Sequence, residues 1–323
     1  MSTVTTTTLS AEMKSFYDMR LIDEASPMLV HEQFGQKRPI PQGGGKTVNF
    51  RRFSPLAKAT TALTEGVTPS GSSLSVSSIS AIVAQYGDYV VQSDVLELTA
   101  VDNTILETTK LLGRQAGLTM DTIVRNALLL GTNKSYAPKY VADTNGNLVE
   151  TEVTKTADLD TSAKLTVDVV QRVVAKLRAQ NAPTIGGDYV CIIHPYVAYP
   201  EWIDAHKYAT PENLYTGEIG KMAGVRFVQS TEAKIDKGGS DNPSGLAVFH
   251  CLFIGDGAYG VTEVTGGGLQ TIVKQKGSSG TADPLDQRSS VGWKGLKAAK
   301  ILVDNYLVDL MCCSKFSATA TAN

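Results

Sequence analysis

The chain has 323 residues, a mass of 34.4 kDa and a formal net charge of −2. This near-neutral balance argues against a protein that condenses nucleic acid by bulk charge, because phosphate neutralisation needs clustered Lys and Arg. No apolar run approaches the length that spans a bilayer, and the length of the chain favours two structural units over one.

The first 45 residues predict an arm rather than a domain. A short amphipathic helix is expected within residues 9–25, with apolar side chains on one face at Met13, Phe16, Tyr17 and Leu21. Two prolines and three glycines then interrupt regular structure before residue 46. The N-terminus lacks the basic and apolar regions of a signal peptide, so folding in a reducing cytoplasm is expected.

Residues 46–91 predict a long two-stranded excursion. The strand-like limbs are KTVNFRRF and SSISAIVAQYGDYVVQ, and residues 65–71 supply turn chemistry between them. Large apolar side chains are few in this ribbon, and an isolated hairpin is marginally stable in water. The ribbon therefore needs another surface to lie on.

The clearest helix is predicted from Thr104 to Leu130, where apolar residues recur at helical spacing. At about 1.5 Å per residue this helix would be roughly 40 Å long, which suits a strut. Asp143 to Asn147 then predict a type I′ turn that joins two short strands.

A compact α+β unit is predicted between residues 160 and 257. Thr166 opens a second helix, DYVCIIHP predicts a buried strand, and residues 199–208 predict a short helix. Two further strands are expected in VRFVQS and GLAVFHCLFIGDG. The segment from residue 291 to 313 is ambiguous between strand and helix.

No motif in the sequence predicts catalysis, a cofactor site or a metal site. IPQGGGKT lacks the first glycine of a phosphate-binding loop, and β-branched residues instead of a helix follow GDGAYG at residues 255–260. The four histidines are scattered without metal-ligand spacing. The four cysteines include no C-x-x-C pair, so buried free thiols are expected.

Several strings, taken in order, resemble the major capsid proteins of tailed bacteriophages, which have the Hong Kong phage (Johnson) fold. They are LTEGVTPSGSSLSVSSISAIVAQYGDYVVQSD, LLGRQAGLTMDTIVRNALLLGT, IIHPYVAYPEWID, GEIGKMAGVRFVQS and ADPLDQRSSVGWKGLKAAKILVD. The last of these is the most specific, and together they extend over almost the whole chain.

The resemblance implies an α+β fold with an N-terminal arm, an extended β-hairpin loop, a peripheral domain containing a long spine helix, and an axial domain. Residues 1–45 would form the arm, 46–91 the extended loop and 92–159 the peripheral domain. Residues 160–257 would form the axial domain, 258–305 the return strands of the peripheral domain, and 306–323 an axial strand and the C-terminal tail. The ambiguous segment would then be β structure, near residues 290–302 and 307–313.

The resemblance also implies a function and partners. Many copies would assemble as hexamers and pentamers into an icosahedral head shell in the host bacterial cytoplasm, and the shell would enclose double-stranded DNA without sequence specificity. A portal protein, a separate scaffolding protein and a decoration protein are the other expected partners, and no membrane is expected.

Two sets of residues are predicted to contact neighbouring subunits. The set on the extended loop comprises Lys46, Arg51, Arg52, Lys58 and Glu65. The set on the peripheral domain comprises Asp283, Asp286, Arg288 and Trp293.

Two alternatives remain open at this point. An encapsulin-like nanocompartment would share the fold but enclose protein cargo, because a fold does not determine a function. A monomeric binding module would use the ribbon as a recognition loop. An enzyme is not expected, because the sequence offers no catalytic constellation.

Overall fold

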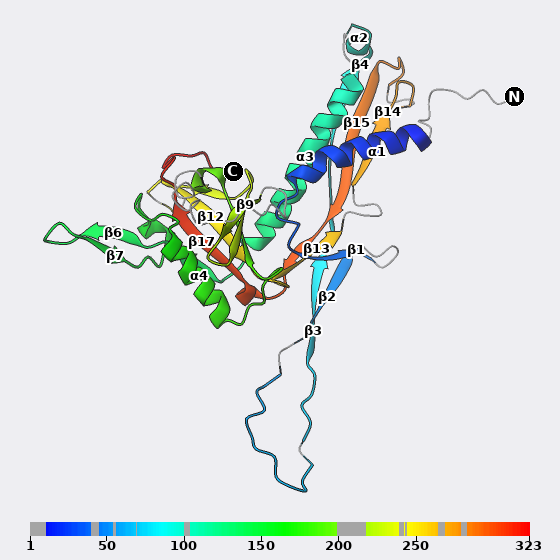
Figure 1. Cartoon of the computed structure of the whole chain (residues 1–323). Helices are drawn as coiled ribbons and strands as arrows, with labels where there is room; N and C mark the ends of the chain where they lie inside the picture. Colours follow the sequence, from blue (N-terminus) through cyan, green and yellow to red (C-terminus); the bar gives the residue numbers. More distant parts are fainter. Residues whose placement is uncertain are drawn as a thin grey trace.

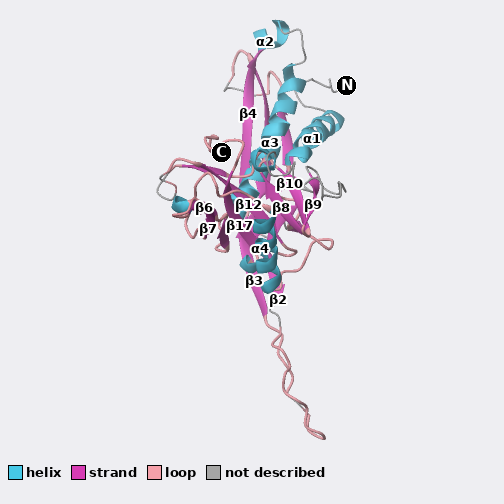
Figure 2. Cartoon of the chain, turned by 60° about the vertical axis from the view of Figure 1, so that its left-hand side comes forward, coloured by secondary structure: helices cyan, strands magenta, loops and turns pink. Residues whose placement is uncertain are grey.

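The computed structural model describes residues 11–39, 45–53, 56–68, 70–99, 104–198, 218–238, 242, 244–263, 269–278 and 283–323. Two units and a projecting loop make up this structure (Figure 1). We call the unit around the largest sheet the sheet unit, and the unit around the longest helix the spine unit. The loop projects away from both units, as Figure 2 also shows.

A seven-stranded sheet forms the centre of the sheet unit. Its order is β5 (Lys134–Tyr136), β17 (Leu307–Cys313), β12 (Ala247–Ile254), β8 (Tyr189–Ile193), β10 (Val225–Gln229) and β9 (Glu218–Met222), and β11 (Ile235–Lys237) also pairs with β12. Every residue of β8, β12 and β17 is buried, in agreement with their continuous apolar sequences.

Helix α4 (Val167–Ala179) packs against one face of this sheet. Val170, Val173 and Leu177 share a core with Phe249 and Phe253 of β12. The predicted start of the helix is confirmed, because the Thr166 side chain accepts a hydrogen bond from the Val169 amide.

Helix α3 (Thr104–Leu128) runs along the spine unit beside a three-stranded sheet of order β14 (Leu269–Lys274), β15 (Arg288–Lys297) and β4 (Ala84–Ser93). Strands β15 and β4 pair antiparallel along their whole length, from Arg288 opposite Ser93 to Lys297 opposite Ala84. The far end of α3 reaches the sheet unit, where Val124 and Leu128 join the core on the second face of the large sheet.

Helix α1 (Ala11–Ala25) crosses α3 where α3 carries two glycines. A Cβ atom at Gly117 would lie 2.6 Å from the Ala25 carbonyl oxygen, and one at Gly113 would lie 3.0 Å from the Glu24 Cβ. The glycines therefore let the two helix backbones approach closely. Leu21 is fully buried here, but Phe16, expected on the same apolar face, is 49% exposed.

The turn after α1 inserts two consecutive polar residues, His31 and Glu32, into the interior. His31 bonds Asp121 of α3 through its backbone amide (2.7 Å to Oδ1) and its ring Nδ1 (2.6 Å to Oδ2). Glu32 Oε2 lies 2.5 Å from Lys297 Nζ of β15, and both side chains are buried. The expected arm is thus anchored into the body of the chain at this turn.

The described residues also form several smaller elements. They are the sheet of β1 (Gln36–Pro39), β13 (Tyr259–Glu263) and β16 (Ala299–Ile301), the hairpin of β2 (Thr47–Phe53) and β3 (Val76–Ile82), the hairpin of β6 (Lys139–Ala142) and β7 (Leu148–Thr151), helix α2 (Asp94–Thr99), and short 3-10 helices at Ser26–Met28, Thr156–Asp158 and Asp304–Tyr306. The predicted turn between β6 and β7 is present, and Asp143 Oδ1 accepts from the amides of Asn145 and Asn147. Its expected type I′ geometry is wrong, because that turn needs two residues with positive φ and only Gly146 of this connection has one.

Two features of the structure cross the boundaries of the expected ranges, which themselves stay predictions. The return limb of the ribbon pairs with β2 only as far as Ile82, and from Ala84 onward it pairs with β15 instead. Residues 134–136, expected with the spine helix, pair with β17 of the sheet unit, and Val153 and Leu159 lie in its core. Both differences arise from pairings between strands that are distant in sequence.

The ambiguous segment from residue 291 to 313 is β structure, as the resemblance implied. The short helix predicted for residues 199–208 lies outside the described residues.

The close crossing of α1 and α3 predicts that a methyl group added at each of the two glycines affects stability to a different extent. Alanine at Gly117 meets backbone at 2.6 Å, so we expect Gly117→Ala to lower the free energy of unfolding by about 1–3 kcal/mol. Gly113→Ala should be near neutral, because its milder contact is offset by a helix-propensity gain of about 1 kcal/mol. Urea unfolding measures both, and equal stability of the Gly117 variant and the wild type would contradict the crossing.

Candidate assembly surfaces

The loop between β2 and β3 has an anchored base and an uncovered tip. At the base, Val48 and Phe50 of β2 pack with Ala298 and Leu302. Phe50 lies so close to Gly260 that a Cβ there would be 2.3 Å from its ring. Apolar side chains toward the tip are at least half exposed, namely Phe53, Leu56, Leu63, Val67, Leu74 and Val76. The described part of the chain therefore supplies a fixed root for this loop but no cover for its far part.

The predicted charged residues of the loop are all exposed. Lys46, Arg51, Arg52, Lys58 and Glu65 point away from the core, and within the described residues none of them forms an ion pair. Arg52 Nη1 donates to the Leu302 carbonyl oxygen at 3.4 Å, which fixes this side chain against the loop root. Arg52 is exposed like the other four, so all five are accessible to a partner.

The second predicted set divides into two kinds of residue. Trp293 is 3% exposed between the three-stranded sheet and α3, and its Nε1 donates to Gln115 Oε1 at 3.2 Å. Asp283 is also buried, and its Oδ2 accepts from the Arg288 amide at 2.8 Å. Both side chains make these contacts within the chain, and their role between subunits stays a prediction. Asp286 and Arg288 are exposed at the same turn.

The outer face of the three-stranded sheet carries a groove that the sequence analysis missed. It has a volume of about 430 Å³ and is lined by Gly87, Tyr89, Ile272, Ser290 and Gly292, with Asp88, Lys274 and Trp293. Tyr89 is 69% exposed. The sequence signal for this groove was a glycine on each of two adjacent strands, together with apolar residues on their neighbours. The groove could be recognised from it only once the pairing of β4 with β15 was known.

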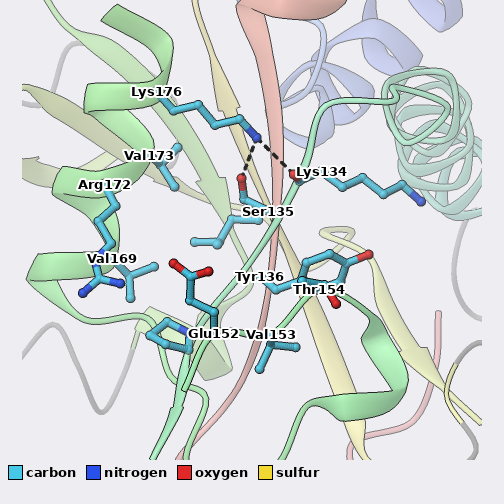
Figure 3. A pocket seen from close by; sticks show the side chains of 12 residues that line it. Lys134, Ser135, Tyr136, Glu152, Val153, Thr154, Val169, Arg172, Val173 and Lys176 are labelled. Atoms are coloured by element: carbon cyan, nitrogen blue, oxygen red, sulfur yellow. Dashed lines mark hydrogen bonds between the residues drawn. The ribbon is translucent and has the colours of Figure 1, made fainter. Parts of the chain in front are cut away.

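A second groove, of about 410 Å³, lies beside β5 in the sheet unit (Figure 3). Lys176 of α4 reaches across it and donates to Ser135 Oγ (2.9 Å) and to the Lys134 carbonyl oxygen (3.1 Å). Burial lowers the pKa of Lys176. Arg172 of α4 pairs with Glu150 of β7 and with Asp168. These contacts brace α4 against β5 and the root of the β6–β7 hairpin.

The buried titratable residues described above form structural contacts. In the described part of the chain, no group of three or more His, Cys, Asp or Glu side chains is placed to hold a metal ion. The four cysteines are free and buried, with Cys251 Sγ 3.6 Å from Cys312 Sγ. None of the described helices combines the length and apolar character required to cross a membrane.

Comparisons with known proteins place this geometry among solved structures. No family model matches the chain, and neither does any curated protein sequence. The capsid of Ralstonia phage GP4 is similar with a TM-score of 0.66 and 15% identity, covering 87% of each chain. The capsid asymmetric unit of cyanophage Pam1 has a TM-score of 0.60 and 12% identity, over 99% of this chain and 97% of that one.

The capsid of cyanophage P-SCSP1u has a TM-score of 0.59 and 14% identity, over 98% of this chain and 93% of the other. These similarities extend over both units and not over one part of the chain. The fold expected from the sequence is therefore confirmed: the chain has the fold of the capsid proteins of tailed bacteriophages.

Proposed function

We propose that this chain is the major building block of a virus head, in which many copies assemble into a closed shell. The observation that carries the proposal is the loop between β2 and β3, which is rooted in the fold but lacks a cover for its apolar residues. The likeness to phage capsids over nearly the whole chain supports it. A structural role without catalysis follows from this proposal.

The loop would obtain its cover from an adjacent copy. Closed symmetry built from unlike contacts requires each copy to present complementary patches, because such contacts form a ring only at the right angle. Many weak contacts together stabilise the finished shell while each one alone stays reversible. The shell would be built from hexamers and pentamers in the host bacterial cytoplasm.

Acidic residues elsewhere in the chain could pair with the cations of the loop when two copies meet. Residues 59–109 contain six acidic residues and no Lys or Arg. They include Asp88 of β4, Asp94 of α2 and Glu107 of α3, which belong to or adjoin the spine unit. We infer that Arg51 and Arg52 contact an acidic surface of this kind on the adjacent copy. Contacts between copies would also involve the other predicted residues that are exposed, namely Lys46, Lys58, Glu65, Asp286 and Arg288.

Other partners follow from the same proposal. A portal protein, a separate scaffolding protein and a decoration protein would complete the head. The enclosed double-stranded DNA would meet the inner face without sequence-specific contacts, in keeping with a net charge of −2.

Assembly tests the proposal directly. Co-expression with the scaffolding protein encoded beside it should give closed particles tens of nanometres across by negative-stain electron microscopy, with hexamers and pentamers visible. A chain that stays monomeric under these conditions and binds or converts a small molecule would overturn the proposal.

The state of the loop can be followed by limited proteolysis. Free subunits should be cleaved between Ser70 and Ser78, because little of the chain covers this segment, whereas assembled particles should resist cleavage. The fragments are identified by mass spectrometry. Equal cleavage rates in free subunits and particles would show that the loop gains no cover on assembly.

Charge reversal tests the role of the two arginines. The double variant Arg51→Glu/Arg52→Glu should fold normally, because both side chains are exposed, but should yield at least tenfold fewer particles. Arg51→Lys/Arg52→Lys keeps the charge and serves as the control. Circular dichroism checks folding and sedimentation measures particle yield; normal yield from the Glu variant would rule out the contact.

A further inference from the structure

Residues 230–237 link the sheet unit to the spine helix through polar contacts. Arg125 Nη1 of α3 donates to the Glu232 carbonyl oxygen at 2.6 Å, and Thr122 Oγ1 donates to Glu232 Oε2 at 3.1 Å. Arg125 is 3% exposed; its Nε and Nη2 donate to Asn126 Oδ1 on the same helix (3.2 and 3.1 Å), so its Nη1 bond to Glu232 is the contact that joins this buried guanidinium to the segment. We call residues 230–237 the linking segment.

A buried histidine holds the other side of the linking segment. His250 of β12 lies between two carboxylates: its Nε2 is 2.9 Å from Asp236 Oδ2 of β11, and its Nδ1 is 2.9 Å from Asp309 Oδ2 of β17. His250 and Asp309 are buried, whereas Asp236 is 44% exposed. An imidazole can donate from both nitrogens only when it is protonated. The arrangement therefore favours the charged form.

Anions outnumber cations around His250, so its proton reduces a local excess of negative charge. The nearby cations are Lys234, 3.5 Å from Asp236, and Arg125; the nearby anions are Asp236, Asp309, Glu232 and, on α3, Asp121. Asp121 also bonds His31. Loss of the His250 proton leaves Asp236 and Asp309 on either side of a neutral ring that can donate to only one of them.

The protonation of His250 has a defined pH range. Burial lowers its pKa, but hydrogen bonds to Asp236 and Asp309 outweigh burial and raise the pKa from 6.5 to about 9. The stabilisation is therefore fully present below about pH 6.5, the unfolded value, and is lost as pH rises through about 9. On the acid side, the same contact lowers the pKa of Asp236, so Asp236 stays ionised near neutral pH.

The last residues of the chain bind the same segment. The Asn323 side chain accepts from the Ile235 amide at 2.9 Å and donates to the carbonyl oxygens of Ala233 (3.0 Å) and Thr231 (3.3 Å). Any loosening of the linking segment is thereby transmitted to the tail as well as to α3.

We propose that protonated His250 is a pin that fastens the linking segment to the large sheet, so that deprotonation loosens the joint between the sheet unit and the spine helix and frees the C-terminal tail. The pin is a property of the folded chain, and it stands whether or not copies assemble into a shell.

Amide hydrogen exchange of the purified subunit tests the pin. After correction for intrinsic exchange rates, protection of amides 231–237 should fall as pH rises from about 6.5 to about 9, by up to about 300-fold in total. Amides of β8, in the same sheet but away from the pin, should keep their protection over this range. A flat profile in residues 231–237 would overturn the proposal.

A pair of variants separates the pin from general packing. In His250→Gln, amides 231–237 should show at pH 7 the low protection that the wild type shows above pH 9. Their protection should no longer change with pH between 6.5 and 9. His194→Gln is the matched control, because His194 is the other described histidine of the sheet and its pKa is lowered by burial rather than raised. If His250→Gln does not fold, the pH dependence of exchange in the wild type decides the question. If both variants fold and show equal protection of amides 231–237, the proposal is wrong.

Discussion

One helix, α3, belongs to two hydrophobic cores, and the geometry of the rest of the chain depends on this. Leu112, Ala116 and Met120 pack with Trp293 of the three-stranded sheet. Val124 and Leu128, further along, pack against the second face of the large sheet. Because the interior of a protein is close-packed, a continuous helix shared by two cores fixes the angle between them. The sheet unit and the spine unit are thus held in one arrangement.

Buried charged side chains around α3 restrict how the neighbouring segments can pack against it. Asp121 binds His31, Arg125 binds Glu232, and Lys297 beside the helix binds Glu32. A buried charge costs several kcal/mol unless it is paired, so each pair tolerates few alternative arrangements. These pairs tie the N-terminal turn and the linking segment to the same helix, and they contribute specificity more than stability.

Under the proposed function, assembly requires both a rigid body that sets the direction of the loop and a loop surface that a neighbour can cover. The root of the loop is fixed by Phe50 against Gly260, so the direction of the loop is set by the body. Its far part lacks apolar cover among the described residues, and under the proposed function a second copy supplies it. Rigid presentation reduces the entropy lost on binding, which lets weak contacts act together in a shell.

The sequence by itself determined the features that depend on local spacing: α3, α4 with its Thr166 cap, the Asp143–Asn147 turn and the buried strands β8 and β12. It also located the exposed loop with Arg51 and Arg52. Only the tertiary structure decided that β4 pairs with β15, that Trp293 is covered by α3, and that His250 lies between Asp236 and Asp309. The reason is physical: periodicity and caps act within a few residues, whereas these contacts join residues 14 to about 200 positions apart, and their partners are selected by the packing of the whole chain.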